Sequence, residues 1–441
     1  MKNLWIATIA GVAGLVIAVS GAQASGFALL EQSAKGLGEA FAGGTTETDD
    51  PAAIFYNPAG IAFMERDAVS AGLSVVTIKM DFENQGSYTA AGTPLLGPDS
   101  TTDTMGYIPN AFAAFKVADN ISAGIGITVP FGLSTRYDRG WVGRYHAVKS
   151  NLKSIDISPA VGWQIIPGLL SVGGAVNIQY LDATLTNSVD FGTILSGAGT
   201  IPQTLDGYAD MNGDDWGIGY SLGACLLLTE TTSVGINYRS KIDHTIDGDV
   251  DFTVPVQARA ILDAIGMSNY FVNTGVEADL TTPASLSMGI AQMLGSSFKV
   301  MADLTWTGWS CFDQLAVEFD SGQPDSVTLE RWSDTWRIAL GVDWYLTQAV
   351  TLRAATSYDD SPVSKNYRTP RIPDNNRLWL ALGVGIDITE DLTVDASYLH
   401  IFMKDMQSNL VNSQDAAKGF LIGEYQDPAI DVASLEFTYR F

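Results

Sequence analysis

The sequence of 441 residues contains only two cysteines, three histidines and, beyond its first 24 residues, no long uninterrupted apolar run. Because a membrane-spanning helix needs ~18 or more apolar residues, any integral contact of the mature chain with a membrane has to be made by a β-barrel. We expect Cys225 and Cys311 to lie near opposite ends of different strands, which leaves two free thiols. No acidic run has the spacing of a calcium loop, so we expect no metal and no cofactor.

Basic residues are also scarce, with 24 Lys and Arg against 49 Asp and Glu and a formal net charge of -25. A chain this acidic is not expected to bind nucleic acid, and its surplus acids are typical of solvated loops. The three histidines, His146, His244 and His400, have no neighbouring Ser/His or His/Asp pattern. We therefore expect no catalytic residues and predict that the protein is not an enzyme.

Residues 1–24 have the pattern of a secretory signal peptide. Lys2 supplies the positive charge, residues 6–19 form the apolar core, and Ala22-Gln23-Ala24 provides small residues for cleavage. We expect the mature chain to begin at Ser25.

Residues 25–67 form the one segment with helical spacing. Leu30, Ala34, Leu37 and Phe41 fall on one apolar stripe. Asp50-Pro51 and Asn57-Pro58 each combine an N-cap residue with proline at the first helical position, which predicts two further helical turns. Glycines at positions 36, 38, 43 and 44 allow the segment to bend. A compact, partly helical N-terminal segment is expected.

Residues 68–441 alternate between apolar and polar side chains, as strands do. Short turns are expected at residues 119–120, 167–168, 230–231, 295–296, 347–348 and 390–391. Long loops are expected at residues 84–104, 138–146, 190–212, 251–275, 319–326, 360–376 and 404–427. Six short and seven long connections join about fourteen strands. The predicted fold class is all-β: a transmembrane antiparallel β-barrel of residues 68–441 whose lumen holds residues 25–67 as a hatch, or plug.

The expected outer face of the barrel is apolar with aromatic ends. Leu435, Phe437 and Phe441 share one parity near the C-terminus. Trp336 and Trp344 share the outward parity and are separated by ~26 Å along a strand, close to the spacing of two aromatic girdles. We therefore predict a multi-pass protein of the bacterial outer membrane, in contact with lipid and lipopolysaccharide. The terminal Phe441 resembles the aromatic by which such barrels contact the barrel-assembly machinery.

Two segments break the alternation. Pro159 lies within an expected strand and predicts a β-bulge. Residues 121–137 carry small inward side chains followed by Pro130, Phe131 and Gly132, which predicts a thin wall with interrupted hydrogen bonding. Such an interruption is equally typical of a side opening and of a strand that makes room for the plug.

Several motifs together resemble one family of outer-membrane transporters. They are NPAG at 57–60, PFGL at 130–133, WVGRY at 141–145, SIDISPA at 154–160, DLTWTGWS at 303–310, DTWR at 334–337, YDDSPV at 358–363 and PDNNR at 373–377. The chain resembles the FadL-type transporters of long-chain fatty acids and other hydrophobic compounds. The resemblance implies fourteen strands, a hatch motif at Asn57, Pro58 and Ala59, an external groove, an inner apolar site, and lateral release at a kink in the third strand.

Apolar ligand-binding candidates lie at both ends of the expected route. The loop 251–275 has a helical stripe that includes Val256, Ile261 and Ile265, with further apolar residues beside it. The stripe is expected either to pack against neighbouring loops or to line an external groove. The apolar candidates are Phe27, Leu29, Leu30, Val256, Ile261, Leu262, Ile265, Met267 and Phe271, of which Phe27 could act as a stopper in the lumen.

Basic residues with inward parity are candidates for a ligand carboxylate, since a fatty acid needs one or two charge-assisted hydrogen bonds. They are Arg239, Lys241, Arg337, Arg353 and Arg377. Pairing with wall or plug acids such as Asp343 and Asp387 is the alternative role for each.

The sequence thus predicts passive uptake of hydrophobic molecules through the outer membrane. Long-chain fatty acids are the first substrate class and aromatic hydrocarbons the second. A lipid hydrolase of the outer membrane and a general porin are competing classes, which ester hydrolysis or ligand-independent conductance would support.

Overall fold

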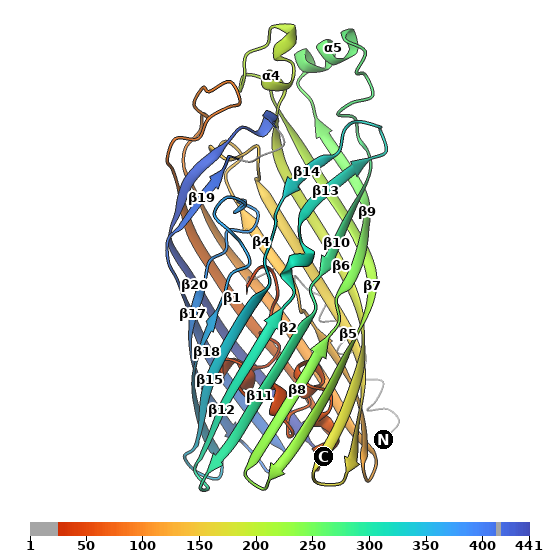
Figure 1. Cartoon of the computed structure of the whole chain (residues 1–441), viewed down its shortest axis with the longest axis vertical. Helices are drawn as coiled ribbons and strands as arrows, with labels where there is room; N and C mark the ends of the chain where they lie inside the picture. The colour runs from red at the N-terminus through yellow and green to blue at the C-terminus, as the bar shows by residue number, and fades with distance from the viewer. Residues whose placement is uncertain (1–24, 412–415) are drawn as a thin grey trace.

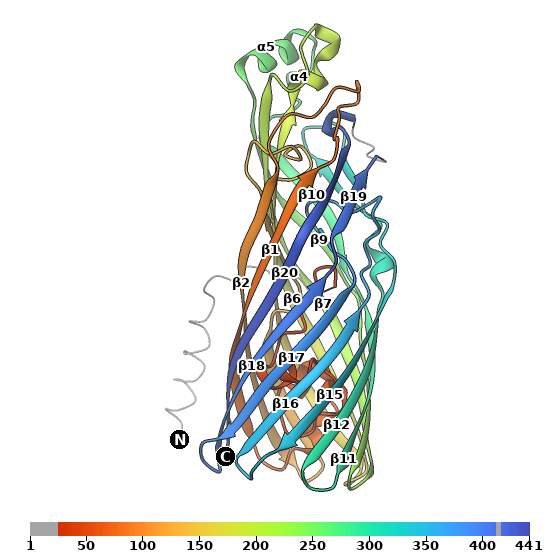
Figure 2. The same cartoon turned by 90° about the vertical axis from the view of Figure 1, so that its left-hand side faces the viewer.

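A closed antiparallel β-barrel forms almost the whole molecule. The computed structural model describes residues 25–411 and 416–441 (Figure 1, Figure 2); the predicted signal peptide lies outside them. Six pairs of consecutive strands, β3 with β4, β8 with β9, β10 with β11, β12 with β13, β14 with β15, and β18 with β19, each continue one wall strand. The 20 strand segments therefore make 20 - 6 = 14 wall strands, which confirms the predicted fold.

The strands are β1 (Ala68–Asn84), β2 (Ser100–Ala118), β3 (Ile121–Thr128), β4 (Gly132–Arg136), β5 (Lys149–Ile166), β6 (Leu170–Asp190), β7 (Asp206–Thr229), β8 (Thr232–Arg239), β9 (Ile242–Thr253), β10 (Thr274–Thr282), β11 (Ser285–Leu294), β12 (Phe298–Thr307), β13 (Gln314–Phe319), β14 (Ser326–Leu329), β15 (Thr335–Tyr345), β16 (Val350–Asp359), β17 (Arg377–Asp387), β18 (Leu392–Met403), β19 (Met406–Leu410) and β20 (Leu421–Arg440). The helices and 3-10 turns of the plug and loops are α2 (Ala34–Gly38), η1 (Gly44–Thr46), α3 (Ala53–Tyr56), η2 (Gly60–Phe63), α4 (Phe191–Ile194), η3 (Ser196–Ala198), α5 (Val256–Ala264), η4 (Trp309–Cys311) and η5 (Ala416–Lys418).

The connections alternate in length as predicted, but the strands run further outward. All six short turns lie between paired strands. The predicted loops 84–104, 190–212 and 404–427 are wrong at their ends, because β2 begins at Ser100, β7 at Asp206 and β20 at Leu421. These outer strand ends carry Asp and Asn where the membrane part of the wall carries apolar residues, so alternation of hydropathy does not mark them.

The barrel closes where β20 pairs with β1, in a ladder that runs from Arg440 beside Ala68 to Gly423 beside Asn84. Trp336 and Trp344 on β15 are about half exposed on the outer face, as expected of girdle residues. Among the described residues, no helix is long and apolar enough to cross a membrane.

The plug lies inside the lower half of the barrel (Figure 2). The two predicted turns are α3 and η2, but their N-caps are Ala52 and Ala59 rather than Asp50 and Asn57. The side chains of Asp50 and Asn57 instead accept hydrogen bonds from Ala52 N and Ala59 N in the turn before each helix. The predicted helical stripe is only partly correct: α2 has five residues, and Phe41 has φ of 61°. The chain turns there so that Phe41 packs on Tyr56 and Trp379.

Charged and polar contacts fix the plug to the wall. Glu39 lies 3.7 Å from Arg353 of β16, and Glu436 of β20 accepts the N–H of Ala34 at 2.6 Å. Asn57 donates to Thr45 O at 2.7 Å and to Ala224 O of β7 at 3.0 Å. A Cβ at wall residue Gly223 would come within 1.9 Å of the Asn57 side chain, so glycine is required for this close approach.

Two smaller expectations concern Pro159 and the cysteines. The bulge predicted at Pro159 is wrong, because β5 keeps one register with β6 from Ile157 to Ala160 and shifts only near Gln164. Pro159 instead sits in the ladder with β3, opposite Ile125. Cys225 is buried and Cys311 is exposed, and both thiols are free as predicted.

Candidate functional site

The third wall strand is interrupted where the sequence predicted it. β3 ends at Thr128 and β4 begins at Gly132. β3 pairs with β2 only from Ala111 to Ala118, and the ladder of β4 is with β5 alone among the described residues. The edge of β2 between Ser100 and Asn110 consequently lacks a strand partner on this side of the described barrel. Backbone N–H and C=O groups of the described wall are therefore left without a strand partner at membrane depth. Such groups need other hydrogen-bond partners.

Side chains of β2 bond part of β4: Thr104 Oγ1 donates to Ser134 O at 3.2 Å, and Thr102 Oγ1 accepts from Arg136 N at 3.2 Å. The first residues of the plug bond the backbone of the interruption itself. Leu29 N donates to Pro130 O at 2.7 Å, and Gly132 N donates to Phe27 O at 2.9 Å. The amide of Gln32 both accepts from Val129 N at 3.0 Å and donates to Val129 O at 2.7 Å. The plug therefore satisfies backbone groups of residues 129–132.

Phe27 lies at the centre of an aromatic group, here the Phe27 box. Its ring centroid lies 4.8 Å from that of Trp309, 5.7 Å from Trp332, 5.8 Å from Phe312 and 5.9 Å from Phe131. These distances are typical of tilted and edge-to-face aromatic packing. The box joins the plug to the interrupted strand and to the inward-folded connections after β12 and β14.

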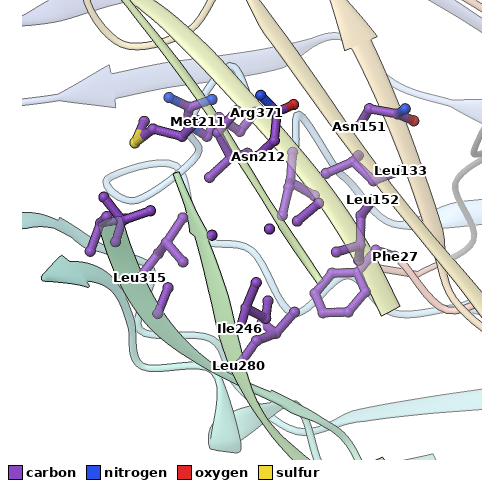
Figure 3. Close-up of a pocket in the computed structure, with 18 of the residues that line it drawn as sticks. Phe27, Leu133, Asn151, Leu152, Met211, Asn212, Ile246, Leu280, Leu315 and Arg371 are labelled. Atoms are coloured by element: carbon purple, nitrogen blue, oxygen red, sulfur yellow. The ribbon is translucent and has the colours of Figure 1, made fainter. Parts of the chain in front are cut away.

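Above the Phe27 box lies a cavity of about 90 Å³, here the apolar cavity (Figure 3). Its wall is almost entirely aliphatic and aromatic. The lining includes Phe27, Leu133, Leu152, Ala183, Leu185, Met211, Ile246, Val276, Ala278, Leu280, Phe312, Leu315, Val317 and Ile372. Phe27 lies at one end of the cavity in Figure 3, and Met211 and Arg371 lie at the other.

Arg371 and Glu330 are the two charged residues of this lining. Arg371 comes from the loop before β17 and is buried, and it donates to Ser150 Oγ at 3.0 Å and to Asn187 Oδ1 at 3.2 Å. Burial lowers the pKa of Arg371 to about 10, so the guanidinium is still charged at neutral pH. No carboxylate of the described residues lies within 4.0 Å of it.

A second and larger cavity, the outer cavity, lies among the extracellular loops. It has a volume of about 640 Å³ and is lined in part by Ile194, Leu195, Phe252 and Phe319. The predicted residues Ile265, Met267 and Phe271 line it as well. Met211 borders both the outer and the apolar cavity, so the two meet at this side chain.

The predicted helix in loop 251–275 is α5, but its apolar stripe has the wrong phase. Val256 is 81% exposed and lines neither cavity. Leu262 is buried and Ile261 half-buried in a loop cluster with Phe191 and Leu195. The helix packs through Ala258 and Leu262, because the facing partner is α4 rather than the lumen.

A third cavity, the polar cavity, lies below the Phe27 box and behind the strand interruption. It has a volume of about 100 Å³ and is lined by Leu29, Leu30, Pro130 and Phe131 together with polar wall residues. The predicted Arg239 and Arg337 both reach it. Arg239 forms an ion pair with Asp156, whereas Arg337 donates to Ala40 O at 3.0 Å and lies 3.7 Å from Asp303.

The other predicted bases are engaged elsewhere. Arg353 bonds Asp395 at 2.6 Å, and Arg377 forms an ion pair with Asp374. The expected inward placement of Lys241 is wrong: its side chain is exposed and lies 3.0 Å from Asp243. The wall strand breaks between β8 and β9, so Arg239 and Lys241 no longer share a face.

Sequence reasoning missed Arg371, Glu330 and Met211. Arg371 and Glu330 lie in connections, where strand parity gives no information about direction. Met211 lies within the predicted loop 190–212, which the structure shows to be strand from Asp206. The one available signal was the loop 360–376 itself, whose PDNNR motif begins two residues after Arg371.

A closed fourteen-stranded barrel, an internal plug and a buried apolar cavity define a channel protein of the outer membrane. Residues 15–441 match the model of the outer membrane protein transport family (OMPP1/FadL/TodX), and the chain belongs to this family. An outer membrane protein of Neisseria meningitidis is 30% identical over 97% of both chains. The long-chain fatty acid transport protein of Escherichia coli is 27% identical over 90% of this chain and 92% of its own.

Among solved structures, a FadL homologue of Pseudomonas aeruginosa superposes with a TM-score of 0.87 at 24% identity, covering 95% of this chain and 100% of its own. This likeness establishes the fold. The protein is therefore a multi-pass outer-membrane transporter of hydrophobic compounds, and its relatives are transport proteins rather than enzymes.

Proposed function

We propose that the protein takes up long-chain fatty acids passively, with capture at the outer cavity, binding in the apolar cavity and release sideways into the membrane. The ligand carboxylate binds Arg371 and the tail points toward the Phe27 box. The name of the Escherichia coli relative supports this substrate class.

The observation that carries the proposal is Arg371. A buried guanidinium is costly unless an anion compensates it. No described carboxylate forms an ion pair with Arg371. A fatty acid would supply both the anion for this guanidinium and an apolar tail that the surrounding side chains accommodate. A hydrocarbon would bring no anion to this guanidinium, with which Glu330 of the same cavity forms no ion pair within 4.0 Å.

The cavity volumes indicate how a long tail is accommodated. The apolar cavity, at about 90 Å³, is smaller than the ~150 Å³ cavity that holds one benzene ring. A long tail therefore needs further space, which it gains by displacing Phe27 toward the polar cavity. The ligand enters from the outer cavity past Met211, and its own tail opens the next section of the route.

The strand interruption at residues 129–131 supports a lateral exit. Apolar chains gain free energy on entering the hydrocarbon interior, whereas passage to the periplasm would expose them to water. Lipopolysaccharide is the outer contact of the loops in this scheme, and lipid is the acceptor of the ligand.

The test compares binding of palmitate, methyl palmitate and toluene to the purified protein. We expect palmitate to bind most tightly and Arg371→Gln to weaken it by about 10- to 100-fold, since a hydrogen bond to a charged group contributes ~1.5–3 kcal/mol. The affinity for methyl palmitate should fall much less in Arg371→Gln than the affinity for palmitate. Arg66→Gln, at the exposed ion pair with Asp391, is the control and should leave binding unchanged. Equal effects on acid and ester would contradict the proposal.

Uptake of aromatic hydrocarbons is the second candidate function. The apolar lining and the aromatic end of the apolar cavity favour it. Toluene binding tighter than that of palmitate, and unaffected by Arg371→Gln, would establish this alternative.

A further inference from the structure

The apolar cavity contains a carboxyl group of the protein itself, that of Glu330 between β14 and β15. Glu330 is 1% exposed. Its Oε2 accepts the indole N–H of Trp332 at 3.1 Å, and its Oε1 accepts the hydroxyl of Thr369 at 3.5 Å. Both donors are neutral, so neither hydrogen bond gives the Glu330 carboxyl the opposite charge that a buried carboxylate requires.

The two hydrogen bonds place Glu330 between the two ends of the site. Trp332 belongs to the Phe27 box, and Thr369 lies two residues before Arg371. Glu330 and Arg371 line the same cavity without forming an ion pair within 4.0 Å. A ligand carboxylate on Arg371 would therefore share an apolar cavity with the Glu330 carboxyl.

We propose that Glu330 is a specificity-determining residue: it is protonated when a fatty-acid anion binds Arg371, and loss of its proton to water weakens ligand binding. The proposal rests on the proposed function. Two ionised carboxylates in one apolar cavity repel each other, and a single guanidinium cannot compensate both. Burial raises the pKa of Glu330 to about 8 against the opposing effects of the Trp332 hydrogen bond and the Arg371 charge.

Three other titratable residues lie near this pair: His146, Tyr208 and Asp313. Burial and the charges of Lys418 and Arg371 lower the pKa of His146 to about 3, so this imidazole is neutral. Tyr208 of β7 faces Arg371, and the backbone carbonyl of the exposed Asp313 accepts from Glu330 N at 2.8 Å. Among the described neighbours, Glu330 is thus the carboxyl whose charge acts on Arg371, across more than ion-pair distance.

The sign of the pH dependence follows. Below a pH of about 8 Glu330 is neutral, and Arg371 attracts the ligand anion fully. Above it, Glu330 ionises, reduces the positive potential at Arg371 and repels the ligand. We expect the affinity for palmitate to fall about tenfold between pH ~7 and pH ~9, a range in which the ligand and Arg371 keep their charges.

The experiment titrates palmitate into the purified full-length protein across this pH range. Glu330→Gln has a neutral side chain at every pH and should keep the neutral-pH affinity at pH ~9. Glu318→Gln, at an exposed carboxyl of β13, is the matched control and should retain the wild-type pH profile. Methyl palmitate should bind without pH dependence. Folding of each variant is checked by the electrophoretic mobility of the intact barrel.

A pH-independent wild type, or the same loss of affinity in Glu330→Gln as in the wild type, would overturn the role of Glu330 while leaving fatty-acid binding intact. Failure of palmitate to bind at any pH, or equal binding of acid and ester, would instead overturn the proposed function and this inference with it.

Discussion

At the scale of single residues, the proposed route assigns to Phe27 the length of tail that fits without rearrangement. We predict that the affinity of the wild type rises with acid length by ~0.8 kcal/mol per CH₂ until the apolar cavity is full, and then levels off because longer tails have to displace Phe27. In Phe27→Ala the gain should continue to longer acids. A binding series of saturated fatty acids of increasing length measures both curves.

Phe63→Ala is the control for this series, since Phe63 is a half-buried plug aromatic that does not line the apolar cavity. It should reproduce the wild-type curve. A levelling-off at the same chain length in Phe27→Ala would refute the role of Phe27 as a stopper.

The residues of the site differ in how well the sequence predicted them. Phe27 was expected in the lumen because it is an apolar residue near the start of the plug, and the structure places it at the end of the apolar cavity. Arg371 and Glu330 could not be assigned, since a side chain in a connection has no parity. The alternation of strand residues placed Lys241 wrongly in the lumen, because the break between β8 and β9 reverses the inward and outward positions.

At the scale of elements, the proposed lateral route reaches the membrane at the interruption between β3 and β4. Pro130 has no N–H to donate, and no partner strand on β2 meets β4 in the described ladder. We predict that the double change Pro130→Val and Gly132→Val favours continuous pairing and lowers the rate of palmitate uptake by cells about tenfold or more, while palmitate binding to the purified protein stays within about twofold, because the apolar cavity is unchanged.

Pro428→Val on β20 is the control, because it replaces a strand proline far from the interruption. Uptake at the wild-type rate by the double variant would exclude the lateral exit. Loss of binding together with uptake would show that the change acts on the cavity instead.

The elements also show which parts of a barrel a sequence predicts. The broken strand, most of the short turns and the two helical turns of the plug were predicted from Gly, Pro, Asp or Asn at a fixed position, whereas the short turns at 230–231 and 347–348 contain none of these residues. The outer ends of β2, β7 and β20 were not, since strands beyond the membrane carry polar residues on their outer faces. The predicted apolar face of α5 was wrong because that face is set by packing against α4, a contact between segments far apart in the sequence.

At the scale of the whole molecule, the plug and the wall depend on each other. Fourteen strands enclose a lumen that the plug fills, and Arg353 links plug residue Glu39 to wall residue Asp395. The plug occupies the lumen and bonds the backbone of the broken strand at residues 129–132. The lateral path predicted from strand number and plug position stays a prediction, which the Pro130→Val and Gly132→Val variant tests.

Assembly of this barrel depends on its last strand, because β20 closes the wall against β1. Phe441 is half exposed on the outer face, stacks on Tyr439 with centroids 6.0 Å apart, and lies 6.2 Å from Phe115. We predict that deletion of Phe441 lowers the amount of folded protein in the outer membrane several-fold, as measured by fractionation and heat-dependent gel mobility. Phe115→Ala removes the neighbouring ring but keeps the terminal aromatic, and should assemble normally. Equal losses in both variants would mean that Phe441 contributes packing, whereas a loss confined to the deletion identifies it as the contact for the assembly machinery.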